Sequence, residues 1–493
     1  MKKSSLTLSK DYKIAQIDKR IYGSFIEHLG RAVYGGIYEP GHETADDMGF
    51  RQDVMALIKE LSVPMVRYPG GNFVSGYNWE DGTGDRSLRP RKMELAWNSI
   101  ETNEVGIDEF QEWAKRVDSD VMMAVNLGTR GADDARNLVE YCNSSTDTYY
   151  AQMRRRNGFE EPFGIKVWCL GNEMDGNWQI GTKRPMEYAR LACETAKLMK
   201  MVDPSIELVA CGSSGPQMPT FGEWEETVLR EAYNHVDYIS LHSYYGNPDN
   251  DSQQYFGSAA IMDKFIKDVV DICDKIKEEK KSDKTIMLSF DEWNVWFHSN
   301  EQDKKQEPWQ VAPPLLEDMY NLEDAIVVGD LMITLLKHSD IVKIACLAQL
   351  VNVIAPIMTE TGGGVWKQTI FYPFMYTSVN GRGTALTTDV ETEVFTAGTA
   401  ENTPCVDAVA VLSEDGKTLS VFAVNRKIGE EAELDIQGVE GFKLVNHISM
   451  EGDDLKAGNS MAEPDKVTPV THEIGDKINL AGGSWNYLQY ELD

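Results

Sequence analysis

Eight short apolar runs recur along the first three quarters of the chain, and segments of helical periodicity lie between them. This alternation is typical of a parallel sheet covered by helices, and eight units over roughly 350 residues favour a (β/α)₈ barrel, an α/β fold. An open doubly wound sheet is the alternative, but it usually carries a glycine-rich phosphate-binding turn after its first strand, and the sequence has none. The runs span residues 21–30, 63–71, 120–128, 165–173, 206–214, 236–244, 285–293 and 344–352.

The pattern changes after about residue 380. Residues 408–427 alternate apolar and polar side chains around an acidic turn that ends in Gly416, which indicates a β-hairpin, and no convincing helix follows. The first 18 residues alternate in the same way and are expected to add a strand to this C-terminal sheet. We therefore predict a barrel over residues 19–380 and a jelly-roll-like all-β sandwich built from residues 1–18 and 381–493.

The composition excludes several classes of ligand. A formal net charge of −31 over 493 residues repels nucleic acid and anionic membranes and disfavours polyanionic substrates, so a neutral sugar or peptide is the expected partner. The N-terminus lacks the apolar core of a secretory signal, and no apolar run reaches the length of a membrane span. The seven cysteines show no CxxC spacing, which favours reduced thiols and a cytoplasmic location. The eight histidines lack metal-site spacing, and we expect neither a metal nor a cofactor.

The active site of such a barrel lies at the carboxyl ends of its strands, so the last residues of each run are the candidates. A glutamate at one strand end is more often a solvated turn residue. Several acids with amide and tyrosine neighbours at the same rim indicate a functional site instead. The side chains expected at this rim include Glu27, Arg67, Asn72, Asn172, Glu173, His242, Tyr244, Asp291, Glu292 and Gln349.

Glu173 and Glu292 stand out within this set. The buried run 167–170 is expected to hold Asn172 and Glu173 rigidly at the rim, and Glu292 ends the seventh run. Two carboxylates that face each other across a pocket are typical of a glycosidase, in which one is protonated to assist the leaving oxygen and the other is ionised to attack the anomeric carbon. Asn172 is placed to bind the sugar hydroxyl next to that carbon.

Five segments are similar to the α-L-arabinofuranosidases of glycoside hydrolase family 51: "GSFIEHLGRAVYGGIYEP", "RYPGGNF", "WCLGNEMDGNWQIG", "LHSY" and "DEWNVW". The resemblance runs through the whole barrel in order and includes the C-terminal β-domain. It implies a retaining double displacement with Glu173 as the general acid/base and Glu292 as the nucleophile. It also implies a homohexamer, and it assigns the binding of the furanose hydroxyls to Glu27, Asn72, Asn172, Tyr244 and Gln349.

Other side chains are expected around this pair. Trp97, Trp178 and Trp296 follow the second, fourth and seventh runs in loops, where they either stack on sugar rings or pack the loops. We expect Arg67 to donate a charged hydrogen bond to Glu292 and keep that carboxylate ionised. His242 either acts likewise or is a satisfied buried histidine.

The function expected from these features is that of an exo-acting, retaining α-L-arabinofuranosidase in arabinan degradation. It would release terminal arabinofuranosyl groups from arabino-oligosaccharides and arabinoxylan fragments. Two alternatives stay open from the sequence. One is a β-xylosidase or endoglucanase on the same barrel, and the other is a carbohydrate-binding protein with an inactive site.

Overall fold

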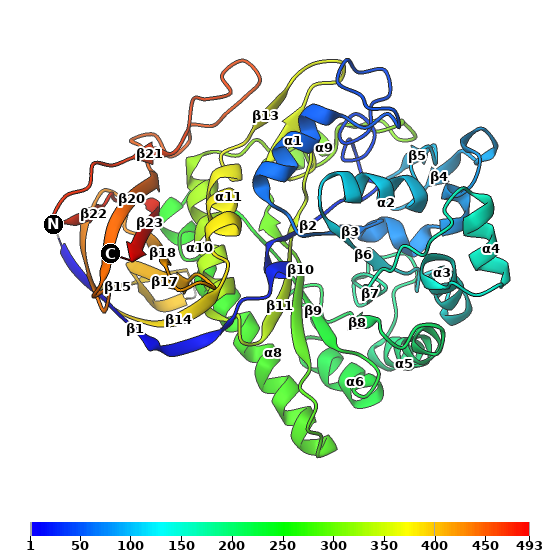
Figure 1. Cartoon of the computed structure of the whole chain (residues 1–493), viewed down its shortest axis with the longest axis horizontal. Helices are drawn as coiled ribbons and strands as arrows, with labels where there is room; N and C mark the ends of the chain where they lie inside the picture. Colours follow the sequence, from blue (N-terminus) through cyan, green and yellow to red (C-terminus); the bar gives the residue numbers. More distant parts are fainter. Residues whose placement is uncertain (1, 399, 493) are drawn as a thin grey trace.

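The structure is a computed structural model that describes residues 2–398 and 400–492. Eight strands form a closed barrel in the order β10-β11-β2-β3-β6-β7-β8-β9, and each of the eight predicted runs supplies one of them. The prediction of a (β/α)₈ barrel is therefore confirmed (Figure 1). The barrel strands are β2 (Gly23–Phe25), β3 (Met65–Tyr68), β6 (Asp120–Ala124), β7 (Val167–Leu170), β8 (Glu207–Ala210), β9 (Tyr238–Tyr245), β10 (Met287–Val295) and β11 (Val342–Ala348).

The helices follow from the amphipathic patterns between the strands. In α1, Val54, Ile58 and Leu61 share one face and are buried, as their spacing predicts. Helix α5 ends at Val202, just before Pro204, which cannot continue a helix. The helices are α1 (Gln52–Leu61), α2 (Ile107–Arg116), α3 (Ala132–Asn143), α4 (Tyr149–Arg156), α5 (Pro185–Val202), α6 (Glu223–Ala232), α7 (Ser252–Tyr255), α8 (Ser258–Lys280), α9 (Asn300–Asp303), α10 (Leu322–Lys337) and α11 (Phe371–Asn380).

Helix α10 is apolar nearly all round because it lies inside the molecule. Every residue from Leu322 to Leu336 is buried. One side of the helix contacts α8, α11 and β10, and the other contacts β17, β18 and β23 of the C-terminal sheet. The helix therefore forms the layer between the barrel and the all-β domain.

The all-β domain consists of one continuous sheet of nine strands in the order β21-β20-β23-β18-β17-β14-β1-β19-β22. Strand β1 pairs with β14 in antiparallel and with β19 in parallel orientation. Successive residues of β17 point to opposite faces of the sheet. Ala408 and Ala410 pack in a core within the domain, whereas Val409 and Val411 join the barrel core. The strands are β1 (Lys2–Gln16), β14 (Thr384–Glu391), β17 (Val406–Leu412), β18 (Thr418–Asn425), β19 (Ala432–Gln437), β20 (Phe442–Met450), β21 (Val470–Thr471), β22 (Ile478–Leu480) and β23 (Ser484–Leu492).

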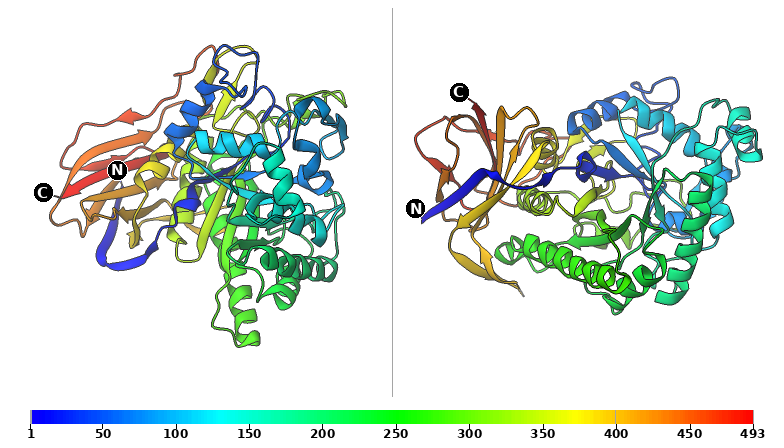
Figure 2. Two further views of the ribbon diagram at one scale, coloured as in Figure 1. Left: turned by 45° about the vertical axis from the view of Figure 1, so that its right-hand side comes forward. Right: turned by 60° about the horizontal axis from the view of Figure 1, so that its bottom comes forward.

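The two ends of the chain lie at the all-β domain, which sits against one side of the barrel (Figure 2). The predicted domain boundaries, after residue 18 and after residue 380, stay a proposal, and Met1 and Asp493 lie outside the described residues. Among the described residues, no helix combines the length and the apolar composition that crossing a membrane requires. The seven cysteines are buried and unpaired.

Three two-stranded hairpins complete the structure. One of them, β4 with β5, follows the second barrel strand and carries Trp97 in its turn. Its turn touches the long loop between β10 and α10, because Trp309 N–H donates to the Asn98 carbonyl and Ile100 N–H donates to the Gln310 carbonyl. The hairpins are β4 (Lys92–Glu94) with β5 (Ser99–Glu101), β12 (Ile357–Thr359) with β13 (Val365–Lys367), and β15 (Val394–Ala397) with β16 (Ala400–Pro404).

Candidate active site

Glu173 reaches the rim through a sharp turn at the end of β7. The four strand residues Val167–Leu170 are all buried. The next residue, Gly171, has φ +88°, and Glu173 itself has φ +44°. Positive φ is costly for a residue with a side chain and persists only where the surrounding structure enforces it. The chain therefore leaves the buried strand abruptly and presents Asn172 and Glu173 at the mouth of the barrel.

A β-bulge in β10 presents two consecutive acids to the same site. Ser289 pairs with Ser240 of β9, and the next pair joins Glu292 to His242, so three steps along β10 match two along β9. An extra residue of this kind re-aims the side chains beside it. As a result, Asp291 and Glu292 both reach the His242 imidazole, at 3.0 Å and 3.5 Å.

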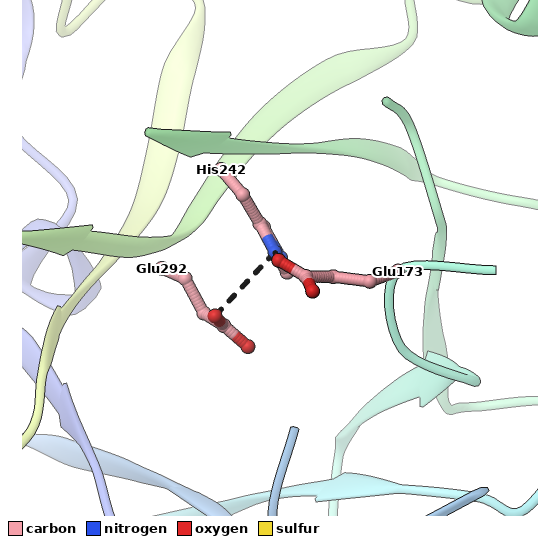
Figure 3. Close-up of side chains that lie close together, drawn as sticks. All are labelled: Glu173, His242 and Glu292. Carbon is pink, nitrogen blue, oxygen red and sulfur yellow. Dashed lines mark hydrogen bonds and ion pairs between the residues drawn. The ribbon is translucent and has the colours of Figure 1, made fainter. Parts of the chain in front are cut away.

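The two predicted catalytic glutamates converge. Carboxylate oxygens of Glu173 and Glu292 and a ring nitrogen of His242 all lie within 4.8 Å of one another. Figure 3 shows the three side chains pointing toward a common centre, His242 from β9, Glu292 from β10 and Glu173 from the segment after β7. Glu173 is 9% exposed and Glu292 5% exposed, so both carboxylates are largely removed from bulk water.

Glu292 is surrounded by hydrogen-bond donors. Arg67 Nη1 donates to its Oε1 at 2.7 Å, and the Tyr244 hydroxyl donates to its Oε2 at 2.8 Å. The buried Arg67 guanidinium also donates through Nη2 to the Asn172 side-chain oxygen at 2.7 Å. A fixed cation and a hydroxyl donor stabilise the ionised form of a carboxylate. The predicted contact between Arg67 and Glu292 is present.

The surroundings of Glu173 favour its protonated form. Burial raises its pKa above the ordinary value, and the charge of Glu292 raises it further, whereas hydrogen bonds from His242 and Trp178 lower it. The balance leaves the pKa of Glu173 raised. A buried carboxyl beside a second, ionised carboxylate is suited to carrying a proton at neutral pH.

His242 links the acids as a cation. Its Nδ1 lies 3.0 Å from Glu173 Oε1, and its Nε2 lies 3.0 Å from Asp291 Oδ1. Burial lowers the pKa of His242, but Glu292, Asp291 and Glu173 together raise it to about 10. Both ring nitrogens face carboxylates, which matches an imidazolium that donates two hydrogen bonds. The histidine therefore supports Glu173 and Asp291 directly and also lies near Glu292.

The geometry of Glu173, His242 and Glu292 would also permit a metal ion, because their donor atoms lie close together. An imidazolium, however, has no lone pair for a metal. Because the pKa of His242 is raised to about 10 and Arg67 pairs with Glu292, two cations already face the acids of the cluster. We interpret the cluster as an ion-pair network that controls protons.

The residues predicted to bind the sugar lie beside this network. A Cβ atom placed on Gly71 would lie 3.0 Å from Glu292 Oε1, 3.3 Å from Asn172 Nδ2 and 3.3 Å from Glu27 Oε2, so these three side chains surround one glycine. The Gln349 side-chain oxygen accepts a hydrogen bond from the Glu27 backbone N–H at 2.9 Å. Asn72 Oδ1 lies 3.5 Å from Asn172 Nδ2. Their binding roles remain proposals.

Glu27 is a further buried acid at this site. Its Oε1 accepts hydrogen bonds from the Phe73 backbone N–H at 2.8 Å and from the Trp97 indole at 2.9 Å. Burial raises the pKa of Glu27 to about 7, with a smaller contribution from the charge of Glu292, against the lowering effect of the two donors.

The three predicted tryptophans have different roles in the structure. The Trp97 indole N–H donates to Glu27, and the Trp178 indole N–H donates to Glu173 Oε2 at 2.7 Å. The Trp296 ring packs edge-on against Tyr244, with ring centroids 5.5 Å apart. Stacking and loop packing were the two expectations from sequence, and neither included hydrogen bonding to the acids.

Asp291 is a site residue that was expected at the rim but to which the sequence assigned no role. It is 1% exposed, it accepts a hydrogen bond from His242, and its Oδ2 lies 3.9 Å from Arg67 Nε. Its position directly before Glu292 was visible, but strict alternation in a strand would turn it away from the pocket. Only the bulge brings it in, and a bulge depends on the register with neighbouring strands.

Two protein-family models match the chain. The model described as "Alpha-L-arabinofuranosidase 1 domain" matches residues 57–264. The model described as "Alpha-L-arabinofuranosidase C-terminal domain" matches residues 291–487, so it begins within β10 and includes the last part of the barrel with the all-β domain.

Relatives of known name align over nearly the whole chain. The "Intracellular exo-alpha-(1->5)-L-arabinofuranosidase 1" of Bacillus subtilis is 56% identical over 99% of this chain and 99% of its own length. The "Exo-alpha-(1->6)-L-arabinofuranosidase" of Bifidobacterium longum is 48% identical over 98% of this chain and 97% of its own length.

Solved structures show the same architecture. AbfB, a family 51 α-L-arabinofuranosidase from Bifidobacterium longum, superimposes with a TM-score of 0.95 at 45% identity and covers 100% of both chains. An α-L-arabinofuranosidase from Thermotoga maritima in complex with arabinose has a TM-score of 0.86 at 35% identity, covering 99% of this chain and 100% of its own.

Proposed function

This chain belongs to the α-L-arabinofuranosidases of glycoside hydrolase family 51, and we propose that it is a retaining, exo-acting enzyme of this class. Its substrates are arabino-oligosaccharides and arabinoxylan fragments, from which it releases terminal α-L-arabinofuranosyl groups. The observation that carries the proposal is the convergence of Glu173 and Glu292 at the carboxyl ends of the barrel strands.

The proposed reaction has two displacements. In the first, Glu292 attacks the anomeric carbon while Glu173 gives its proton to the glycosidic oxygen, so that the leaving sugar departs as an alcohol and an arabinosyl ester forms on Glu292. In the second, Glu173 takes a proton from a water molecule, which attacks the same carbon and releases arabinose. Each displacement inverts the anomeric centre, and the two together retain its configuration.

The separation of the two carboxylates supports this mechanism. Retaining glycosidases hold their carboxyl groups about 5–5.5 Å apart, whereas inverting enzymes leave about 6.5–9.5 Å for a water molecule. One oxygen of Glu173 and one of Glu292 lie within 4.8 Å of each other, which is compatible with the shorter, retaining separation.

The surroundings of the two acids support the assignment of their roles. Arg67 and Tyr244 hold Glu292 by two hydrogen bonds, as a nucleophile that must stay ionised requires. The raised pKa of Glu173 suits a residue that must hold a proton before the bond breaks. Glu27, Asn72, Asn172 and Gln349 are the proposed ligands of the furanose hydroxyls.

Names of relatives support a linkage and a location. The Bacillus subtilis relative is named an intracellular exo-α-(1→5)-L-arabinofuranosidase, and we extend the (1→5) preference and a cytoplasmic location to this chain. The net charge of −31 suits a neutral oligosaccharide. A homohexamer remains part of the proposal, and light scattering on the purified protein tests it.

Azide rescue of two variants tests the assigned roles on an aryl α-L-arabinofuranoside. In Glu292→Ala, azide takes the place of the nucleophile and should give the β-configured arabinosyl azide. In Glu173→Ala, azide attacks the arabinosyl ester on Glu292 and should give the α-configured azide. The same anomer from both variants, or good turnover by a variant lacking both glutamates, would overturn the mechanism.

The two alternatives have distinct outcomes in such assays. A β-xylosidase or endoglucanase would hydrolyse an aryl β-D-xyloside or a glucan better than the arabinofuranoside. A carbohydrate-binding protein with an inactive site would hydrolyse none of them. The described site contains both carboxylates in hydrogen-bonded positions, which favours an active enzyme.

A further inference from the structure

Trp178 is an exposed side chain that contacts a buried acid. The residue is 50% exposed, yet its indole N–H donates to Oε2 of Glu173 at 2.7 Å. The ring lies directly against Gly176, where a Cβ atom would be 2.6 Å from the indole Cε2 and 2.7 Å from Cζ2. One hydrogen bond therefore holds the Trp178 side chain, and its ring fits in this position because residue 176 is a glycine.

This hydrogen bond occupies the oxygen that acid catalysis needs. Glu173 Oε1 already faces the His242 imidazolium at 3.0 Å, so Oε2 is the oxygen left to protonate the leaving group. An indole N–H is a donor only, and it binds an ionised carboxylate more strongly than a protonated one. While the indole remains in place, it opposes the protonated state in which Glu173 acts as an acid.

We propose that Trp178 is a positioning residue that caps Oε2 of Glu173 in the free enzyme and is displaced when the leaving-group part of the substrate takes its place. The proposal rests on the acid/base role of Glu173 given above. Because the ring is half exposed, it has room to move toward solvent.

The displacement couples substrate binding to the protonation of Glu173. Once the indole leaves, Glu173 loses a donor that lowers its pKa, and the carboxyl takes up a proton from solvent. That proton then passes to the glycosidic oxygen as the bond to the anomeric carbon breaks. Glu173 therefore holds a proton less readily while the indole is in place, and more readily once a leaving group has displaced it.

Two variants test the cap in different ways. Trp178→Phe keeps an aromatic ring but removes the N–H, and Gly176→Ala keeps the indole but displaces it by crowding. The pH profile of kcat/KM reports the free enzyme, whereas that of kcat reports the substrate complex. In both variants we expect the basic limb of kcat/KM to move up by about 0.5–1 pH unit, since a hydrogen bond to a charged group is worth about 1.5–3 kcal/mol before solvent exposure weakens it. The basic limb of kcat should stay where it is.

Trp296→Phe is the matched control. It also removes an indole N–H close to the catalytic acids, but Trp296 Nε1 is buried without a hydrogen-bond partner among the described residues. Whatever this substitution does to the rate, neither basic limb should move.

The outcomes separate the cap from the mechanism beneath it. A kcat/KM limb that does not move in Trp178→Phe would overturn the proposal, and equal movement of both limbs would show that the indole stays in place throughout turnover. If azide rescue still gives opposite anomers from the two glutamate variants, only the cap fails. If azide rescue fails as well, the acid/base assignment fails with it.

Discussion

Two clusters of charges within the described part of the chain differ in their balance. At the mouth of the barrel, three acids lie with two cations. We call this set the catalytic cluster, and its members touch one another through ion pairs of 2.7–3.9 Å. It consists of Arg67, Glu173, His242, Asp291 and Glu292.

The second set, the junction cluster, joins α10 to the all-β domain and contains Asp330, Lys337, Asp407 and Arg426. Arg426 binds both oxygens of Asp330 at 2.7 Å and reaches Asp407 at 3.1 Å, and Lys337 binds Asp407 at 2.7 Å. Two acids thus face two cations. Burial raises the pKa of Asp407, but Lys337 and Arg426 outweigh this effect and leave it lowered.

The difference shows how one kind of interaction serves two purposes. In the junction cluster every charge has a partner, so the network holds two domains together, although burial raises the pKa of Asp330. In the catalytic cluster the acids outnumber the cations, and burial together with the charge of Glu292 leaves the pKa of Glu173 raised. We interpret the unbalanced cluster at the barrel mouth as the one that supports proton chemistry, and the fully paired cluster at the domain junction as structural.

The largest expected effect is on catalysis by the catalytic cluster. Glu292→Gln removes the nucleophile but keeps its shape, and we expect kcat to fall by about 10⁴-fold or more. The melting temperature should change little, because two acids, Glu173 and Asp291, still face the two cations, and Arg67 keeps its hydrogen bond to Asn172. A variant that loses stability while its folded fraction keeps full activity would contradict the catalytic role assigned to this cluster.

The next effect separates the two acids of the catalytic cluster. Glu173→Ala removes the general acid, which is worth about 10²–10⁴-fold when the leaving group is poor. We expect a loss of about 10³-fold on an arabino-oligosaccharide and a much smaller loss on a nitrophenyl arabinofuranoside, whose leaving group needs no proton. Steady-state kinetics on both substrates measure the ratio, and equal losses would contradict the acid role.

The junction cluster should respond in stability instead. Asp330→Asn leaves the buried Arg426 without its bidentate partner, and breaking a buried pair costs about 3–5 kcal/mol. Thermal unfolding should show a large drop, with kcat of the folded enzyme nearly unchanged. Glu301→Gln is the control, since it breaks an exposed pair with Lys304 and should leave the melting temperature unchanged. A loss of kcat without loss of stability would show that the junction cluster takes part in catalysis.

The smallest effect is a pH dependence of stability. The pKa of His242 in the folded protein is about 10, above the ordinary value of 6.5. A raised pKa contributes stability that is fully present below pH 6.5 and is lost as the pH rises toward 10. In His242→Gln, the melting temperature should therefore fall less over this interval than in the parent protein. Parallel curves for the two proteins would show that the imidazolium is not stabilised by its three acids.

Much of the fold follows from local patterns in the sequence. The eight runs predicted the barrel strands because an apolar run between helical segments is a local signal. The pairing of Glu173 with Glu292 then follows from the rule that barrel sites lie at strand ends.

The rest depends on contacts that no local pattern contains. Asp291 enters the site through a bulge that is set by the register with β9 and β11. The indole donors Trp97 and Trp178 lie in loops whose path depends on the whole rim. Arg426 and Asp330 lie 96 positions apart, and their pairing appears only when the all-β domain packs on α10.

The stereochemistry of the first product tests the central claim most directly. Proton NMR spectra, recorded within the first minutes of hydrolysis of an aryl α-L-arabinofuranoside, distinguish the anomers of arabinofuranose before they interconvert. If Glu173 and Glu292 act as a retaining pair, the α-anomer should appear first and the β-anomer only later, by mutarotation. A β-anomer that appears first would show a single displacement and would contradict the account.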